Sequence, residues 1–117
     1  MPKEATYTGS ALAERMKGLK GWDEDAGTIR RVYATDGWPT TLMLVNMIGF
    51  FAEAADHHPD LSVSWGKVEV RLSSHSAGGI TDKDVELARL IESNALWRPD
   101  SGALSGTSKQ WVTAESR

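Results

Sequence analysis

Residues 53–75 have the sequence EAADHHPDLSVSWGKVEVRLSSH, and this stretch contains all three histidines of the chain. From Leu61 to Trp65 the apolar side chains occupy odd positions, and from Val68 to Leu72 they occupy even positions. A single straight strand cannot change parity in this way, because half of its apolar side chains would then face water. A β-hairpin with a two-residue loop at Trp65 and Gly66 removes the conflict. The stretch therefore predicts a hairpin at about 61–74.

The register of this hairpin predicts where the histidines meet. Pairing residues on either side of the loop, and continuing to the open end, sets His57 opposite Ser74 and His58 opposite Ser73. Directly opposite residues of antiparallel strands lie about 5 Å apart. His75 follows Ser74, so the three imidazoles are expected to converge on one patch, although a proline interrupts the ladder before it reaches them.

The order of the predicted elements indicates the fold class. Apolar residues at helical spacing predict helices at about 10–19 and 40–56, and a third helix is expected from the N-cap Thr81 to about Asn94. Strand-like runs at about 22–25 and 28–34 predict a first hairpin. This α-β-β-α-β-β-α order predicts a two-layer α+β fold, with a four-stranded antiparallel sheet and helices on one face.

The length of 117 residues predicts one domain, which we place at 1–95. Residues 96–117 are expected to form a C-terminal tail that docks on the domain or on a neighbouring subunit, because the tail carries tryptophan and leucine side chains. The apolar residues of 40–56 cover more than one helix face. That helix is therefore expected to bury one face on the sheet and part of another on a partner subunit.

Composition argues against several classes of function. The net charge of −3 argues against general nucleic-acid binding, for which a basic surface would be expected. The chain has no cysteine, which excludes disulfides, thiolate catalysis and cysteine-ligated zinc. The longest apolar-rich run, about 42–55, is too short to span a bilayer, and the N-terminal residues do not form a signal peptide. A soluble, cytoplasmic protein without nucleic-acid or membrane partners is expected.

The predicted histidine patch indicates acid–base chemistry. Imidazole titrates near pH 6.5 and can therefore both donate and accept protons at neutral pH. Glu53 and Asp84 supply carboxylates that can fix the tautomer of a neighbouring histidine. No Gly-X-Ser-X-Gly nucleophile motif is present.

Other interpretations of the same residues stay open. Three histidines can hold zinc, but His57 and His58 are adjacent, whereas metal ligands usually lie two residues apart on a strand or four apart on a helix. Glu53 could be a solvated carboxylate and Asp84 a helix-capping residue. Trp65 could pack at the edge of the turn, and the two serines could simply be polar residues at a strand end.

The spacing of these residues resembles the signature of the pterin-4a-carbinolamine dehydratases. In this chain the spacing runs from Glu53 through His57-His58-Pro59, Trp65 and His75 to Asp84. The resemblance extends over about 8–95, since residues 67–84 are similar to the second hairpin and last helix of that family. The tail lies outside it.

The resemblance implies a hydro-lyase that dehydrates 4a-hydroxytetrahydropterins to quinonoid dihydropterins in tetrahydrobiopterin recycling, without a metal or an organic cofactor. It implies that His57 and His75 form the acid–base pair and that His58 positions the substrate. It further implies that Glu53 and Asp84 are supporting carboxylates. The predicted catalytic residues are His57, His75, His58 and Glu53, and the predicted substrate-binding residues are His58, Ser73, Ser74, Asp84 and Trp65.

The resemblance also leaves a non-catalytic alternative. Some animal members act in addition as dimerisation cofactors of a homeodomain transcription factor, and certain bacterial relatives that lack the histidine motif are assembly factors. The motif is complete in this chain, which favours the enzyme. The family forms dimers and tetramers, so a homodimer or homotetramer with a small pterin substrate is expected.

Overall fold

The computed structural model describes residues 4–109 and 111–113. The first three residues, on which part of the signal-peptide argument rests, and residues 110 and 114–117 of the predicted tail lie outside this description. The elements are α1 (Gly9–Arg15), β1 (Asp23–Asp25), β2 (Thr28–Thr35), α2 (Trp38–Ala55), β3 (Asp60–Ser64), β4 (Lys67–Leu72), α3 (Asp82–Ala95) and β5 (Val112–Thr113).

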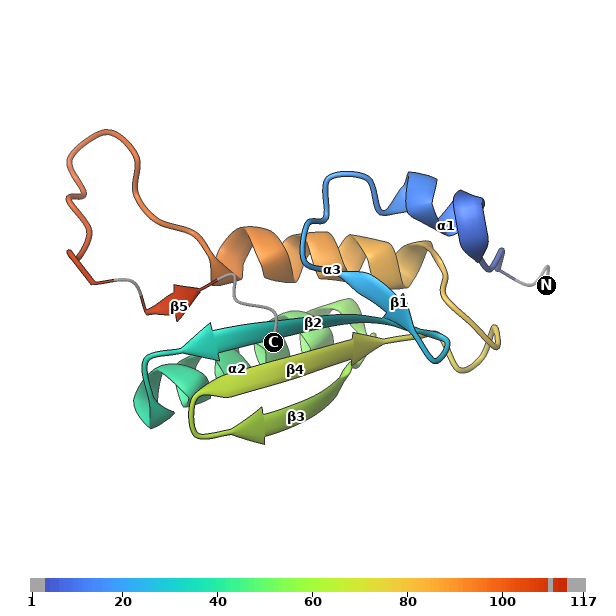
Figure 1. Cartoon of the computed structure of the whole chain (residues 1–117), viewed down its shortest axis with the longest axis horizontal. Helices are drawn as coiled ribbons and strands as arrows, with labels where there is room; N and C mark the ends of the chain where they lie inside the picture. Colours follow the sequence, from blue (N-terminus) through green and yellow to red (C-terminus); the bar gives the residue numbers. More distant parts are fainter. Residues whose placement is uncertain (1–3, 110, 114–117) are drawn as a thin grey trace.

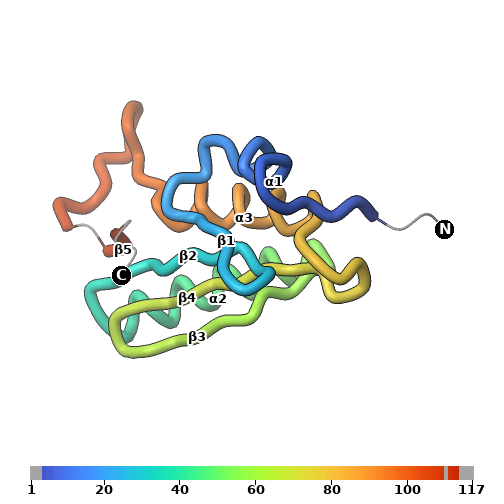
Figure 2. The backbone as a smooth tube through the Cα atoms, turned by 45° about the vertical axis from the view of Figure 1, so that its right-hand side comes forward, coloured from blue at the N-terminus to red at the C-terminus, as the bar shows by residue number. Residues whose placement is uncertain are grey.

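The molecule has two layers, with helices on one face of an antiparallel sheet (Figure 1). The strands lie in the order β1-β2-β4-β3, so the predicted α+β fold is confirmed. A fifth, two-residue strand, β5, was not predicted; its residues pair with Ala34 and Thr35 at the end of β2. Helix α1 lies beside α3 (Figure 2), where Arg89 donates hydrogen bonds to the carbonyls of Arg15 and Lys17.

The register of the second hairpin is the predicted one. Ser64 pairs with Lys67 across the loop, and the ladder continues to Asp60 and Arg71. The first hairpin, β1–β2, also forms where it was expected. Toward the histidines the predicted ladder does not continue, because residues 57–59 connect α2 to β3 without strand pairing.

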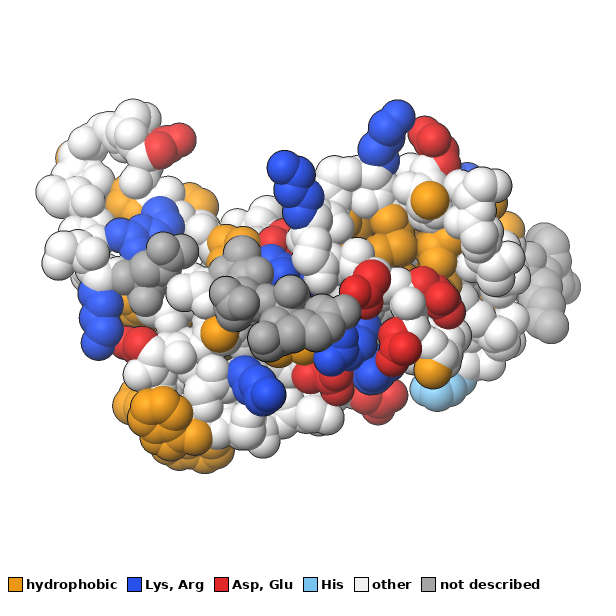
Figure 3. All heavy atoms as spheres, viewed as in Figure 1, with side chains coloured by type: hydrophobic (Ala, Val, Ile, Leu, Met, Phe, Trp, Pro, Cys, Tyr) orange, Lys and Arg blue, Asp and Glu red, His pale blue; other side chains and the backbone are white. Residues whose placement is uncertain are grey.

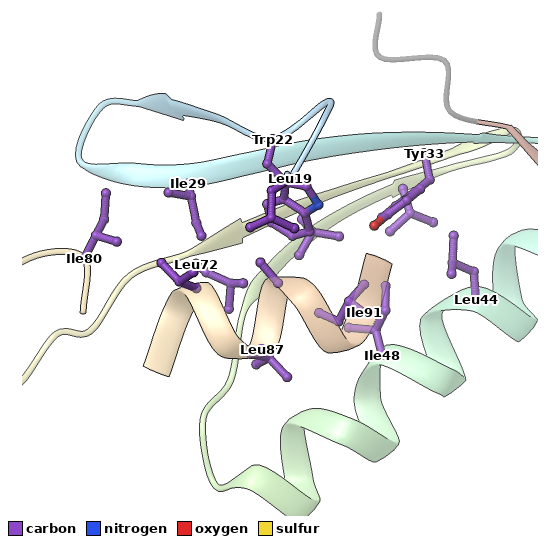
Figure 4. Close-up of a cluster of buried hydrophobic side chains, with 14 of the residues drawn as sticks. Leu19, Trp22, Ile29, Tyr33, Leu44, Ile48, Leu72, Ile80, Leu87 and Ile91 are labelled. Carbon is purple, nitrogen blue, oxygen red and sulfur yellow. The ribbon is translucent and has the colours of Figure 1, made fainter. Parts of the chain in front are cut away.

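The inward face of the sheet forms the core, and Figure 4 shows its side chains lying between the strands and the helices. Alternate residues of β4 point inward and are fully buried, whereas those between them form the polar outer face. The core includes Ile29 and Tyr33 from β2, Val68, Val70 and Leu72 from β4, Leu44 and Ile48 from α2, and Leu87, Ala88 and Ile91 from α3.

The helix boundaries differ from prediction in places that have local causes. Helix α1 ends at Arg15 rather than near residue 19, because the chain enters a turn in which Gly18 has φ +87°. Helix α2 begins at Trp38, earlier than expected, with Pro39 in its first turn, where the missing N–H is not needed. The predicted N-cap of α3, Thr81, is confirmed, and the helix ends at Ala95.

One buried polar cluster joins α3 to the sheet. The carboxylate of Glu92 accepts hydrogen bonds from Arg31 Nε (3.0 Å) and Nη2 (2.9 Å), from the Tyr33 hydroxyl (2.6 Å) and from Trp22 Nε1 (2.9 Å). Arg31 is only 2% exposed. Gly21 leaves room for its guanidinium, which a Cβ at that position would overlap.

Arg31 and Glu92 stabilise each other's ionised forms. Burial alone would lower the pKa of Arg31 and raise that of Glu92, but their shared hydrogen bonds outweigh burial. The pKa of Glu92 therefore lies below its ordinary value and that of Arg31 above. Burial, reinforced by the carboxylate of Glu92, raises the pKa of Tyr33.

Candidate active site

The end of α2 positions the first two histidines. Asp56 has a left-handed conformation (φ 54°), and its N–H and that of His57 bond back to the last turn of the helix. Pro59 then prevents the helix from continuing. His57 consequently leaves the helix axis and meets the first turn of α3.

Asp84 holds His57 from inside the protein. Its Oδ1 lies 2.6 Å from His57 Nε2, while its Oδ2 accepts a hydrogen bond from the Ser74 hydroxyl (2.8 Å) and another from the Thr81 N–H (2.8 Å). The Ser74 and Thr81 hydroxyls are themselves 2.8 Å apart. Both oxygens of the carboxylate are thus engaged, and the carboxylate is fully buried.

This geometry gives Asp84 a specific role. The carboxylate is buried and both of its oxygens are occupied in the structure, and His57 is one of the groups that it contacts. The substrate-binding role expected for Asp84 from the sequence stays a prediction. The capping-box pattern of Thr81 and Asp84 is also confirmed, since each side chain bonds the backbone N–H groups at the start of α3. The same carboxylate therefore caps the helix and orients the histidine.

His58 faces outward. Its Nε2 lies 2.9 Å from Glu53 Oε1, and both side chains are largely exposed. Because solvent surrounds the pair, it contributes little to stability. An exposed imidazole beside a carboxylate is available to a bound molecule.

His75 lies in the loop that follows β4. Ser74 forms a bridge with Gly79, and its carbonyl accepts hydrogen bonds from the N–H groups of Ala77 and Gly78, so residues 75–78 form a tight turn. His75 is exposed on that turn. Since its neighbour Ser74 bonds the carboxylate that holds His57, the two histidines lie at the same end of the sheet. Within residues 4–109 and 111–113, no hydrogen bond joins the imidazoles of His57 and His75; the ring nitrogen Nε2 of His57 is bonded to Asp84 instead.

The two remaining predicted site residues, Ser73 and Trp65, lie at opposite ends of β4. Ser73 is half-buried at the end of β4, next to Ser74. Trp65 lies in the β3–β4 turn, at the other end of β4, which is about 20 Å long at 3.3 Å per residue. A single chain therefore does not bring Trp65 to the histidines.

Sequence reasoning named Thr81 only as a helix cap and missed its place in the hydrogen-bond network behind His57. The signal was present, because a threonine three residues before an acidic residue is a capping box, and that acidic residue was already a site candidate. In the described part of the chain, no three side chains of His, Asp or Glu are grouped to hold a metal ion. No helix of residues 4–109 is long and apolar enough to cross a membrane.

The structure thus combines an antiparallel sheet, covered by helices on one face, with a histidine held by a buried carboxylate at one end of that sheet. The family model for pterin 4 alpha carbinolamine dehydratase matches residues 5–94. This chain belongs to that family.

Similar proteins agree with this assignment. A relative from Aquifex aeolicus, named "Putative pterin-4-alpha-carbinolamine dehydratase", is 46% identical over 81 residues, which are 69% of this chain and 82% of the relative. A relative of the same name from Roseiflexus castenholzii is 39% identical over 88 residues, covering 75% of this chain and 95% of the relative. The crystal structure of a transcriptional coactivator/pterin dehydratase from Brucella melitensis superposes with a TM-score of 0.73 at 28% identity, covering 78% of this chain and 99% of that one.

Proposed function

We propose that this protein removes the 4a-hydroxyl group of 4a-hydroxytetrahydropterin, giving a quinonoid dihydropterin and water, in the recycling of tetrahydrobiopterin. The observation that carries the proposal is the 2.6 Å contact between His57 Nε2 and the buried carboxylate of Asp84. Membership of the dehydratase family supports it.

The reaction needs two proton movements. One proton must reach the 4a-oxygen as the C4a–O bond breaks, and the N5 proton must leave as the C4a–N5 double bond forms. His57 and His75 are the proposed acid–base pair for these steps, and each positioned group of this kind contributes roughly 10²–10⁴-fold.

The contacts of His57 indicate which of its nitrogens reacts. An ionised carboxylate can only accept hydrogen bonds, so the bond between Asp84 Oδ1 and His57 Nε2 is assigned with Nε2–H as the donor. In the neutral ring Nδ1 then carries the free lone pair. Nδ1 is therefore the atom proposed to exchange the proton with the pterin.

The other site residues have proposed binding roles. His58, which is exposed beside Glu53, is placed to position the substrate. The strand end at Ser73 and Ser74 offers polar groups to the edge of the pterin. Asp84 and Glu53 support the two histidines that they contact.

A stopped-flow ultraviolet assay of 4a-hydroxytetrahydropterin decay tests the proposal. The native protein should accelerate the decay, and His75→Ala should lose roughly 100-fold or more in kcat while its near-ultraviolet circular dichroism stays native. His58→Ala is the matched control, and we expect it to raise KM more than it lowers kcat.

The alternative is a non-catalytic binding, assembly or coactivator function on the same scaffold, which the name of the Brucella melitensis relative brings into consideration. If a folded native protein did not accelerate the decay, the dehydratase proposal would be wrong and the alternative would be favoured.

A further inference from the structure

A second potential site lies far from the histidines. A cavity of about 410 Å³ opens between the first half of α2, the end of α3 and the C-terminal segment. Its volume falls within the range of small-molecule sites, which is roughly 300–1,000 Å³. His57 and Asp84 lie at the opposite ends of these two helices. The cavity is lined by Thr40, Met43, Leu44, Met47, Asn94, Ala95, Leu96, Trp97, Arg98, Pro99, Gly106, Thr107, Trp111 and Val112.

Specific contacts hold the C-terminal wall of this cavity in place. Arg98 donates hydrogen bonds to the carbonyls of Thr107 and Lys109, which closes the loop between them. Trp111 Nε1 donates to the Thr107 hydroxyl (2.9 Å), and the Trp111 carbonyl accepts from the N–H of Asp36 (3.0 Å). Lys109 also pairs with Asp36 at 2.7 Å. The wall is therefore preformed, which lowers the entropic cost of binding.

Most of this wall lies outside the region that the chain shares with its family. The family model ends at residue 94, whereas Trp97, Arg98, Thr107 and Trp111 come from the segment beyond it. This segment joins the family fold through β5, which pairs with the end of β2. The cavity is accordingly a feature that the dehydratase reaction does not explain.

The lining indicates the chemistry of a ligand. Two tryptophans and two methionines supply flat and adaptable apolar surface, which suits an aromatic body. Arg98 is the single charged residue of the lining, and no acidic side chain pairs with it in the part of the chain that the structure describes. Its guanidinium keeps N–H groups beyond the two that bond carbonyls. A carboxylate is the natural complement of such a group.

We propose that this cavity binds a small amphipathic anion, with its acidic group on Arg98 and a flat apolar body between the methionines of α2 and the tryptophans of the C-terminal segment. Binding here does not depend on the dehydratase activity, because no residue of the lining belongs to the histidine site.

The test uses the full-length protein and 1-anilinonaphthalene-8-sulfonate, a fluorescent probe with an aromatic body and an anionic group. We expect saturable binding of the probe and its displacement by 2-naphthoate. The uncharged analogue 2-naphthamide should compete about tenfold less well, because it lacks the charge-assisted hydrogen bonds to Arg98.

Two variants separate the parts of the site. Arg98→Gln should weaken 2-naphthoate about tenfold more than it weakens 2-naphthamide, because the lost loop contacts affect both compounds and the lost charge affects only the acid. Met43→Trp, at a half-exposed position of the lining, should fill part of the cavity and weaken both compounds. Trp65→Leu is the control, since Trp65 is exposed but lies outside the cavity, and it should leave binding unchanged. All variants should keep the native far-ultraviolet circular dichroism and a cooperative unfolding transition, and Arg98→Gln should keep the native dehydration rate.

Several results would overturn this proposal. Equal affinity for 2-naphthoate and 2-naphthamide would show that Arg98 does not bind the carboxylate. Loss of binding in Trp65→Leu but not in Met43→Trp would place the probe elsewhere. If light scattering showed an oligomer and the probe bound only to dissociated chains, a second copy would be the occupant of the cavity.

Discussion

At Asp84, one carboxylate closes the first turn of α3 and holds the imidazole of His57. Its two functions can be separated, because Thr81 contributes to the cap without contacting the histidine. Asp84→Asn replaces an oxygen that only accepts hydrogen bonds by an NH₂ group that only donates them, so His57 or Ser74 would have to change from donor to acceptor. The chemical effect of such an exchange should therefore be larger than its effect on stability.

We predict that Asp84→Asn lowers kcat by roughly 100-fold, because the amide no longer fixes His57 with Nδ1 free. KM should change little, since the Asp84 side chain is fully buried behind His57, and the pH profile of kcat should shift. The measurement is the stopped-flow decay assay across pH 5–9.

Thr81→Ala is the matched control for this prediction. It should cost about 1 kcal/mol of stability through the lost N-cap, yet keep most of kcat. Equal losses of kcat in the two variants would show that Asp84 acts only through the stability of the helix.

At the scale of elements, α3 is fixed to the sheet by charge as well as by apolar packing. Glu92 reaches Arg31 and Tyr33 on β2 and also Trp22, which precedes β1. The pKa of Glu92 is lowered, so the folded protein binds this proton less readily than the unfolded chain does. The ionised carboxylate of Glu92 therefore makes its full contribution to the free energy of unfolding above the ordinary glutamate pKa, near 4.3. That contribution is lost as the pH falls through the lower pKa that Glu92 has in the folded protein.

We predict that Glu92→Gln lowers the free energy of unfolding at pH 7 by ~3 kcal/mol, because the buried guanidinium of Arg31 loses the charged carboxylate that accepts two of its hydrogen bonds. The difference from the native protein should shrink below about pH 4, where the native carboxylate becomes protonated. Urea unfolding at pH 7 and at pH 3 measures both values. A difference that stays constant with pH would contradict the assignment of this cluster.

The hairpins could be predicted because their signal is local. The change of parity at Trp65 and Gly66 determines both the turn and the register, and the structure has both. The Glu92 cluster carries no such signal. Arg31 occupies an inward position of β2 next to an outward arginine, and its partner lies 61 residues further along the chain. Only the packing of α3 on the sheet brings the two together.

The candidate site was predictable to a similar extent. The hairpin register indicated that His57 and His75 lie at one end of the sheet, and the resemblance to the family added Asp84 to them. It could not show that Asp84 is buried with both oxygens occupied, since that depends on how the Ser74 and Thr81 side chains turn. Strand β5 was missed because two residues are too few to show alternation.

At the scale of the whole molecule, the part of the chain that the structure describes leaves large apolar side chains exposed in several places, two of which involve α2. One is a stripe on α2, where Trp38, Leu42 and Phe50 share an outward face at intervals of four and eight residues. The other lies over the β3–β4 turn and the start of α2, where Figure 3 shows hydrophobic side chains gathered at one end of the molecule; Trp65 is 68% exposed there. The α2 stripe is the better surface for self-association, because its large apolar side chains lie along one helix and can pack against the same helix of a second copy.

We predict that the protein forms a homodimer or homotetramer through the α2 stripe, and that Phe50→Glu lowers its mass in solution. Phe50 is 69% exposed, so the substitution should leave the fold of the single chain intact while placing a charge in the contact. Multi-angle light scattering over a range of protein concentrations measures the mass. Trp65→Glu is the matched control, since it introduces the same charge at an equally exposed aromatic residue away from the middle of α2, and it should leave the mass unchanged. A native protein that stays monomeric at every concentration, or a loss of mass in Trp65→Glu alone, would show that α2 is not the contact.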